Sequence, residues 1–385
     1  MANLTPSPAA AVLDQGRAAL QNLLGEEWEV TVQPEELPGG DHGWEAVLQI
    51  KSNNEGNFAQ LLVDVREKIT PKDVFGFLTS TALLVRRVNH YTRLMVFSPW
   101  ISPKTQEALR EQGIDYLDLT GNVSLRVSRP AVVIHTRGAD RAPAGHRTAS
   151  AKPLLTGARA GRLIRLLADV APPYRTTELA QHAGLSVPYV SRLLDALEDQ
   201  LLVGREGKVI TSVDWQELLR TRASHLDLMR LTNPQGMLAP NGLQAVLDRL
   251  IKRDGVVAGQ DVLVTGSYAA RPIAPVAVGG QLMLYVSPDP AAGHTIAREL
   301  GLMPVPEGGD VLLLHAPDSS VLHRPRRYDR YRQVGPSQLV LDCLSGPGRM
   351  PAEGEKVLEF MAAEEHSWRI ADLSRLSGTE EPGLL

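Results

Sequence analysis

Short apolar segments alternate with amphipathic ones over the first 140 residues. Trp44–Ile50 and Gln60–Val65 are rich in β-branched and apolar residues and are flanked by turn residues, which predicts two strands. Ser102, Pro103 and Gly113 are typical of an N-cap, a first helical residue and a helix stop. The same patterns predict helices at Pro71–Val88 and Ser102–Gly113, and strands at Arg93–Phe97, Ile114–Leu119, Val123–Val127 and Ala131–His135. Together these elements predict an α/β domain on a mixed sheet over residues 1–140.

The composition changes after this domain. Residues 141–156 hold small residues, Pro, Gly and basic residues without apolar periodicity, which predicts a linker. Helical spacing resumes at Ala160–Ala171, and residues 157–225 combine short helices with a hairpin pattern. Residues 226–385 mix a predicted helix with strands, at Leu243–Lys252 and at Val262–Thr265, Leu282–Val286 and Val311–Leu314. The chain is therefore expected to be a multidomain α/β and α+β protein.

Two short helices joined by a tight turn are predicted within Tyr174–Val213. Thr176 is the expected N-cap of the first helix, with Glu178 in its first turn, and Gly184 permits the turn. Ser186 is the expected N-cap of the second helix. An apolar stripe at i, i+3, i+4, i+7 and i+11 is formed there by Val190, Leu193, Leu194, Leu197 and Leu201. The stripe predicts that this face packs against a core.

The opposite face of the second helix changes character along its length. Its first part is neutral, hydrogen-bonding or cationic, with Val187, Pro188, Tyr189, Ser191 and Arg192. Its later part is acidic, with Asp195, Glu198 and Asp199. A helix that enters the DNA major groove by its N-terminal end suits this order, because the acids then lie away from the phosphates.

A hairpin with a basic tip is predicted next, at Leu202–Thr211 around Arg205-Glu206-Gly207-Lys208. The sequence GLSVPYVSRLLDALEDQLLVGREGKV thus resembles the turn, recognition helix and wing of a winged helix-turn-helix. The resemblance implies binding to double-stranded DNA. The residues expected to contact DNA are Arg159, Arg162, Arg175, Thr176, Ser186, Pro188, Tyr189, Ser191, Arg192, Arg205 and Lys208. A helical hairpin that serves only protein–protein contact is the alternative.

The distribution of charge favours the DNA-binding interpretation. The net charge is −4, but Arg126–Arg175 holds ten basic and two acidic residues, whereas Pro351–Leu385 holds three basic and eight acidic ones. A basic segment in an acidic protein suits local contact with nucleic acid. That segment includes Arg159, Arg162 and Arg165. Their side chains are expected either to contact phosphates or only to keep the surface of the helix hydrated.

Composition narrows the class of protein further. The 385 residues are 43% hydrophobic and 22% charged, an ordinary globular balance. The single cysteine, Cys343, excludes an intramolecular disulfide and a cysteine zinc cluster, and the ten histidines lack HExxH spacing. The sequence shows no secretory signal and no apolar run of about 18 residues. A cytoplasmic protein without membrane contact, metal or cofactor is expected.

The first domain carries a carboxylate pattern that nucleases use. Glu45 lies on one predicted strand, and Asp64 and Arg66 on or after the next. The arrangement resembles the restriction-endonuclease-like fold, in which an acid and an acid-x-Lys pair hold Mg²⁺ and activate water. Arg66 stands in the place of the lysine, and arginine keeps its proton. A non-catalytic domain of that shape is expected, with a Mg²⁺-dependent DNA endonuclease using Glu45, Asp64 and Arg66 as the alternative.

The third section resembles a nucleotidyltransferase-like α/β domain. Val262–Ala269 (VLVTGSYA) is similar to the opening motif of that fold, where backbone amides cradle a phosphate. The next strand, Gln281–Val286, lacks the Asp-x-Asp pair needed for Mg²⁺, and Asp289 stands alone. A degenerate, non-catalytic domain is expected. Arg324–Arg332 suits nucleic acid, an acidic partner or the acidic tail.

The order of these domains, with YLDLTGNVSL and SGPGRMPAEGE, is similar to that of large bacterial regulators of the type IV (AbiE-like) antitoxin group. The expectation is a sequence-specific double-stranded DNA-binding transcriptional regulator that catalyses no reaction. A homodimer and a protein partner stay open, and an antitoxin that acts by protein–protein contact is the second alternative. The Thr120-Gly121-Asn122 turn either lines a pocket or simply connects two strands.

Overall fold

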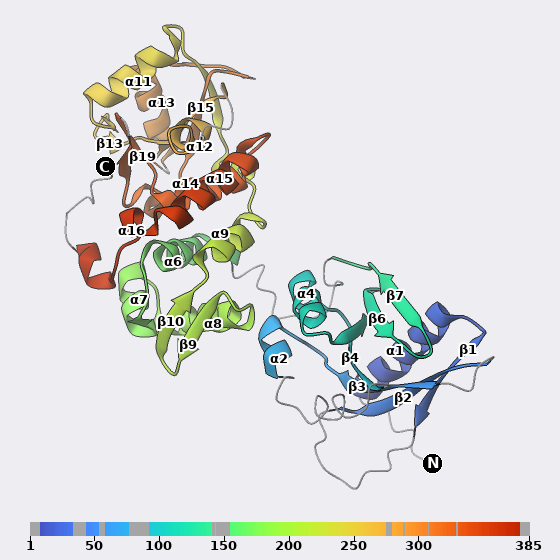
Figure 1. Ribbon diagram of the computed structural model, residues 1–385. Helices are drawn as coiled ribbons and strands as arrows, with labels where there is room; N and C mark the ends of the chain where they lie inside the picture. Colours follow the sequence, from blue (N-terminus) through green and yellow to red (C-terminus); the bar gives the residue numbers. More distant parts are fainter. Residues whose placement is uncertain are drawn as a thin grey trace, which may run out of the picture. The chain divides into compact units, whose positions relative to one another are not determined.

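The computed structural model describes residues 8–33, 44–53, 58–76, 92–140, 143, 155–274, 279–287, 289–306, 308–328 and 330–377. Contacts divide the chain into two compact units, Met1–Ala149 and a second formed by Ser150–Glu198 with Leu202–Leu385 (Figure 1). Among the described helices, none is long and apolar enough to cross a lipid bilayer.

The N-terminal unit is a mixed sheet with helices on both faces. Its elements are α1 (Pro8–Leu24), β1 (Trp28–Gln33), β2 (Ala46–Ser52), β3 (Phe58–Val65), α2 (Pro71–Gly76), β4 (Thr92–Ser98), α4 (Pro103–Glu111), β5 (Asp115–Asp118), β6 (Val123–Val127) and β7 (Val132–Thr136). The seven strands lie in sequence order, with β3, β4 and β5 parallel and the other neighbours antiparallel. Val12 and Leu20 of α1 pack on one face, and Val74 and Leu109 of α2 and α4 on the other.

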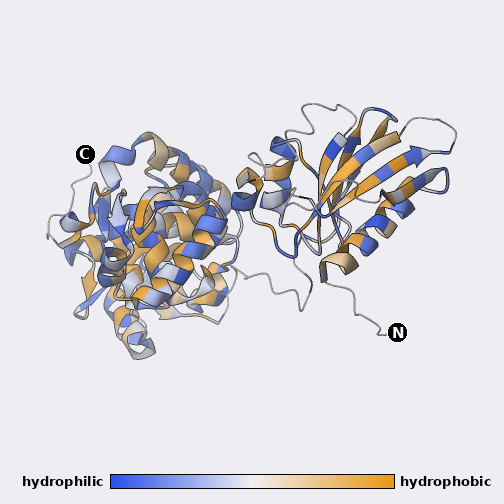
Figure 2. Cartoon of the chain, turned by 90° about the horizontal axis from the view of Figure 1, so that it is seen from below, coloured by the Kyte–Doolittle hydropathy of each residue, from blue (hydrophilic) through white to orange (hydrophobic). Residues whose placement is uncertain are grey.

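Figure 2 shows the alternation of hydrophobic and hydrophilic residues that produces these layers. All the strands predicted for this unit are present, and β1 and α1 are additional. Ser102 caps α4 by accepting a hydrogen bond from the Thr105 backbone N–H at 3.2 Å, and Gly113 follows the helix at φ +63°, both as predicted. Of the helix predicted at Pro71–Val88, only Pro71–Gly76 lies within the described residues.

The turn after β5 is a structural connection, held by one buried carboxylate. Asp118 accepts hydrogen bonds from the backbone N–H groups of Ile101, Thr120 and Asn122 at 2.9–3.1 Å. The Thr120 hydroxyl and the Asn122 amide also donate to it, at 2.7 and 2.8 Å. Asn122 in turn accepts from the backbone N–H of Gly138 at 2.8 Å. The DLTGN sequence therefore joins β5 to β6 and anchors the segment after β7.

The C-terminal unit begins with a module of four helices and a small sheet. Its elements are α6 (Ala158–Asp169), β8 (Tyr174–Arg175), α7 (Thr176–Ala183), α8 (Val187–Asp199), β9 (Val203–Glu206), β10 (Val209–Val213) and α9 (Trp215–Ala223), with the strands in the order β8-β10-β9. Leu155, at the end of the predicted linker, is buried in this unit, while most of residues 141–156 lie outside the described part.

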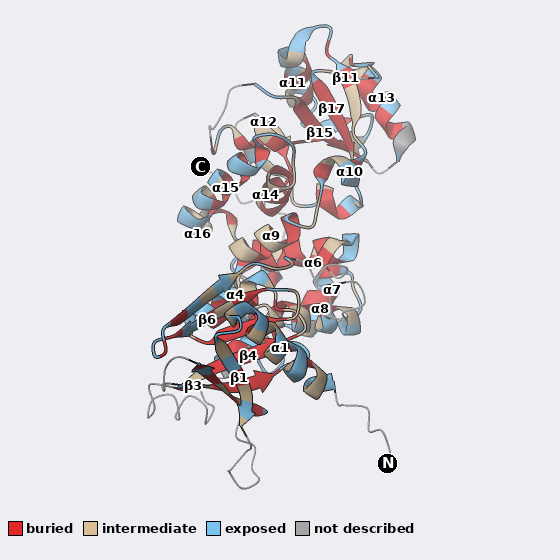
Figure 3. Ribbon diagram, turned by 90° about the vertical axis from the view of Figure 1, so that its right-hand side faces the viewer, coloured by how far each residue is buried: buried red, intermediate tan, exposed pale blue. Residues whose placement is uncertain are grey.

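A second seven-stranded sheet follows, in the order β16-β11-β17-β15-β14-β19-β18. Its strands are β11 (Gln235–Leu238), β14 (Leu263–Thr265), β15 (Leu282–Val286), β16 (Met303–Pro304), β17 (Val311–His315), β18 (Arg326–Tyr328) and β19 (Tyr331–Gln333), beside the separate pair β12 (Val256–Val257) and β13 (Gln260–Asp261). The helices are α10 (Leu228–Thr232), α11 (Gly242–Lys252), α12 (Gly266–Ala270), α13 (Pro290–Leu300), α14 (Pro336–Leu344), α15 (Met350–Ala363) and α16 (Glu365–Trp368), with 3-10 turns η2 (Ser319–Leu322) and η3 (Leu373–Ser377). Figure 3 shows β15 and β17 buried at its centre.

The four-helix module and the second sheet share one hydrophobic core. Trp215 of α9 packs edge-to-face on Trp368 of α16, with ring centroids 4.9 Å apart. A parallel bridge joins Val170 to Ile370, where the Ile370 N–H donates to the Asp169 carbonyl at 2.8 Å. The two parts of this unit therefore form a single packed body.

Candidate nucleic-acid interface

The helix-turn-helix is closed by a left-handed glycine. Leu179, Ala180 and Ala183 form the buried face of α7. Gly184 then adopts φ +61°, and the next N–H, of Leu185, donates to the Ala180 carbonyl at 2.9 Å. This turn sets the angle between α7 and α8.

The start of α7 differs from the prediction. Thr176 is the first helical residue, and Arg175 occupies the N-cap position. The Glu178 carboxylate accepts from the Arg175 backbone N–H at 2.7 Å, so an acid in the first turn satisfies this donor. The sequence predicted that the Thr176 hydroxyl would cap the start of α7. The Glu178 carboxylate, from the first turn of the helix, accepts the hydrogen bond there instead.

The second helix, α8, divides into a buried face and an exposed N-terminal face. Val190, Leu193, Leu194 and Leu197 are buried, as their spacing predicts. Leu201 is not part of this stripe: the helix ends at Asp199, and Leu201 has φ +57° and is 40% exposed.

The N-terminal face of α8 holds the predicted base-contacting residues. Ser186, Pro188 and Arg192 are exposed, and Tyr189 and Ser191 are half-buried. The Ser186 carbonyl accepts from the backbone N–H groups of Tyr189 and Val190, so Ser186 stands at the start of α8. Arg192 donates from Nε to the Pro188 carbonyl at 3.3 Å, a weak contact that leaves most of its guanidinium in solvent. The structure thus presents these side chains together on one helix end.

The wing is a two-residue hairpin attached to α8 by ion pairs. Glu206 pairs with Val209 across the tip, Gly207 has φ +62°, and Lys208 is exposed there. Arg205, predicted to contact DNA, lies lower on β9. It binds Asp195 at 2.7 Å and also Glu198.

Arg205 therefore departs from its predicted role. Its guanidinium neutralises the acidic end of α8 and fixes the wing to that helix. Among the predicted wing cations, Lys208 is the one that projects at the tip.

The arginines of α6 also fall into different classes. Arg159 is exposed. Arg162 is half-buried and donates to the Ala183 carbonyl at 3.1 Å, which joins α6 to the end of α7. Arg165 is only 6% exposed and donates to Gln338 of α14 at 2.9 Å and to Ser320. Phosphate contact by Arg165 is thereby excluded, because its donors are consumed inside the unit.

The two carboxylates of the nuclease-like pattern, Asp64 and Glu45, accept hydrogen bonds from other residues of the N-terminal unit. Asp64 is 1% exposed and binds the Arg66 guanidinium through Nε and Nη2 at 3.1 and 3.0 Å. Burial raises the pKa of Asp64 to about 6, and the neighbouring Glu45 adds to the effect. Glu45 accepts from the Val65 N–H at 2.6 Å. No group of three metal-ligating side chains occurs in the described part of the chain.

The glycine-serine turn of the third section is closed to a phosphate. Gly266 is buried, and a Cβ at this position would come within 2.9 Å of the Met283 sulfur. The Ser267 hydroxyl donates to the buried Glu353 at 2.5 Å. Asp289 stands on the connection between β15 and α13, apart from this turn.

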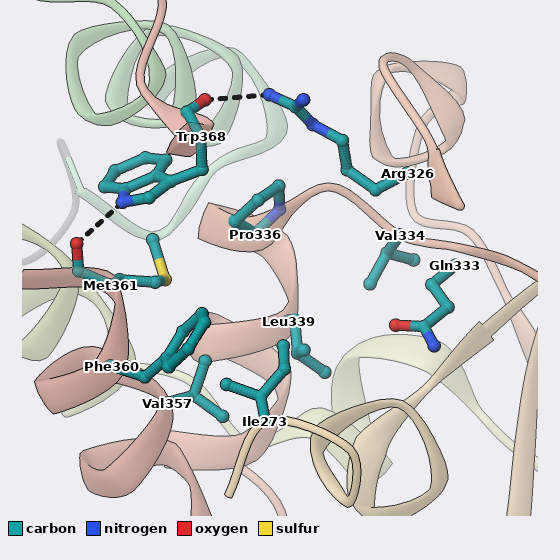
Figure 4. Close-up of a pocket in the computed structure, with 10 residues that line it drawn as sticks. All are labelled: Ile273, Arg326, Gln333, Val334, Pro336, Leu339, Val357, Phe360, Met361 and Trp368. Carbon is teal, nitrogen blue, oxygen red and sulfur yellow. Dashed lines mark hydrogen bonds between the residues drawn. The ribbon is translucent and has the colours of Figure 1, made fainter. Parts of the chain in front are cut away.

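The arginines of Arg324–Arg332 are largely tied to the rest of the unit. Arg324 pairs with Asp169 at 3.0 Å and Arg332 with Asp261 at 2.7 Å, and Arg327 binds Asp254. Figure 4 shows Arg326 donating to the Trp368 carbonyl, at 2.7 Å, beside a small apolar cavity. That cavity has a volume of about 30 Å³, room for little more than a water molecule. These aspartates lie outside the acidic tail, so the observed partners of this arginine segment differ from the nucleic acid, acidic partner and acidic tail that the sequence suggested.

A known family of DNA-binding domains matches the part of the chain that contains this interface. Residues 158–207 match the IclR helix-turn-helix domain, a range that runs from α6 to the tip of the wing. The match supports a DNA-binding transcriptional regulator with a helix-turn-helix domain. No curated protein and no solved structure matches the chain.

Proposed function

We propose that the protein binds a specific double-stranded DNA sequence through the N-terminal end of α8 and regulates transcription. The observation that carries this proposal is the exposed cluster of Pro188, Tyr189, Ser191 and Arg192 on a helix whose other face is buried. A recognition helix needs such an end to reach base edges in the major groove. Lys208 at the wing tip and Arg159 and Arg175 around α6 and α7 are proposed to contact phosphates.

Arg192→Ala is expected to weaken binding to the specific site by about 1–3 kcal/mol and to relax preference at one base pair. The physical reason is that its mostly solvated guanidinium offers the paired donors that guanine accepts. The target site comes from a genome-wide occupancy map, and affinities are measured on that site and on a scrambled duplex.

Lys208→Ala is the matched comparison in the same titrations. If Lys208 contacts a phosphate, its loss should weaken binding to both duplexes equally and lower the salt slope of binding by about one unit. If Arg192→Ala left specific affinity unchanged on a folded protein, the proposed orientation of α8 would be wrong.

We also propose that the N-terminal unit is a non-catalytic domain of restriction-endonuclease-like shape, and that the protein catalyses no reaction. Supercoiled plasmid incubated with the full chain in Mg²⁺ or Mn²⁺ is expected to stay intact. The reason is that Arg66 holds Asp64 in a three-contact ion pair and cannot act as a base. Cleavage that disappears in Asp64→Asn would establish the endonuclease instead.

For the second sheet we propose a degenerate nucleotidyltransferase-like domain. The term degenerate refers to its glycine-serine turn, where Gly266 is packed against Met283. An AbiE-like antitoxin that acts by protein–protein contact is the alternative, and a partner protein or homodimer would be revealed by the mass of the complex isolated from cells.

A further inference from the structure

The N-terminal unit contains a basic cleft that DNA binding by α8 does not use. It has a volume of about 320 Å³, which is within the range of small-molecule sites. Its lining residues lie on α4, β4, the start of β5 and the β6–β7 hairpin. Its charged lining consists of Arg93, Arg110, Arg126 and Asp115, with His135 at the hairpin.

Strand register explains why this face is open. Ser124 pairs with His135 and Arg126 with Val133, so these four side chains share one face of the hairpin. The residues between them, Leu125 among them, face the core on the opposite side. Val133 is 73% exposed, so the face that carries Arg126 and His135 is open to solvent.

The arginines of the cleft are not equivalent. Asp115, 4% exposed, accepts from Arg93 Nε at 2.8 Å and from the Arg126 backbone N–H at 3.1 Å. This carboxylate fixes Arg93 in place. Arg110 and Arg126 form no ion pair with any described residue, and both are exposed.

We propose that this cleft binds a small organic phosphate monoester. Three guanidinium groups and one carboxylate give a formal charge of +2 with His135 neutral, which matches a phosphate monoester of charge about −1.5 to −2. Arg110 and Arg126 supply forked donors for the phosphoryl oxygens. Val133 offers an apolar contact for the carbon skeleton. A carboxylate ligand of charge −1 leaves one arginine unneutralised.

The shape of the site favours a small ligand over a nucleic-acid strand. A phosphate backbone is followed by a row of cations on an open surface, whereas these arginines line a single cavity. The inference concerns a separate unit from α8 and goes beyond the proposed function. Its failure leaves DNA recognition by α8 untouched.

The test is calorimetric titration of the full chain with AMP, ribose 5-phosphate and inorganic phosphate at fixed ionic strength. We expect saturable binding of at least one ester, tighter than that of inorganic phosphate. Arg110→Gln and Arg126→Gln should each weaken it by about 10-fold or more, because each removes a charge-assisted hydrogen bond.

Lys51→Gln is the matched control, since Lys51 is an exposed cation on β2 outside the cleft. It should bind the ester as the parent does, and thermal unfolding should confirm that all three variants are folded. Equal weakening by Lys51→Gln would overturn the proposal in favour of general charge attraction. Inorganic phosphate binding as tightly as the esters, absence of saturable binding at millimolar ligand, or displacement of a bound ester by a non-specific DNA duplex would also overturn it.

Discussion

Replacing Arg165 by methionine is expected to lower the free energy of unfolding of the C-terminal unit by about 2–4 kcal/mol. The methionine keeps the apolar stem of the side chain but removes the guanidinium group with its donors. Gln338 then loses a hydrogen bond of 2.9 Å and Ser320 loses a second one, inside a region from which water is excluded. Each buried polar group without a partner costs about 1–3 kcal/mol.

Arg159→Met is the matched control for this experiment. It makes the same chemical change on the same helix, but at an exposed position, so its effect should stay within about 0.5 kcal/mol. Urea unfolding followed by circular dichroism measures both. An Arg165→Met protein as stable as the parent would mean that burying the guanidinium costs as much as its hydrogen bonds contribute.

Asp342→Asn is expected to stabilise the protein at neutral pH but not in acid. Asp342 is 2% exposed, and burial raises its pKa from 3.8 to about 6. Its folded-state pKa therefore lies above the unfolded one, so the folded chain binds more protons between about pH 4 and 6. Stability from this group is present below about pH 4 and is lost as pH rises through about 6.

The expected size of this loss is about 3 kcal/mol, from a shift of about two pKa units. Asparagine fits the site: Oδ1 can accept from Tyr285 and Gln338, which donate at 2.9 and 2.7 Å, and Nδ2 then faces the Thr265 hydroxyl. Unfolding free energies of parent and variant are compared between about pH 4 and 7. A difference that does not grow with pH would contradict the raised pKa.

Local sequence signals predicted the helix-turn-helix well. The stripe from Val190 to Leu197 and the turn at Gly184 depend on neighbours within one or two helical turns. The capping of α4 by Ser102 is of the same kind. Such features are readable because spacing alone decides which side chains share a face.

The failures concern side chains whose partners are distant in sequence. Arg165 lies in a basic segment and was expected to contact phosphate or solvent, but its partner Gln338 is 173 positions away. Arg205 was expected at the wing tip, yet Asp195 and Glu198 hold it. For Arg205, the signal in the sequence was a pair of acidic residues near the end of α8 followed by a basic residue on β9. Helix α1 was missed because its buried side consists of only Val12, Gly16 and Leu20.

The bridge between Val170 and Ile370 bears on how the chain folds during its synthesis. The helix-turn-helix leaves the ribosome before the rest of its unit, with the flank of α6 and the ring of Trp215 still uncovered. Ile370 and Trp368 complete that surface only after about 150 to 200 further residues have been translated. Until the last segment of the unit has been translated, the hydrophobic surfaces of α6 and α9 therefore remain partly exposed to solvent. A ribosome that stops early releases a protein whose helix-turn-helix lacks part of the core that stabilises it.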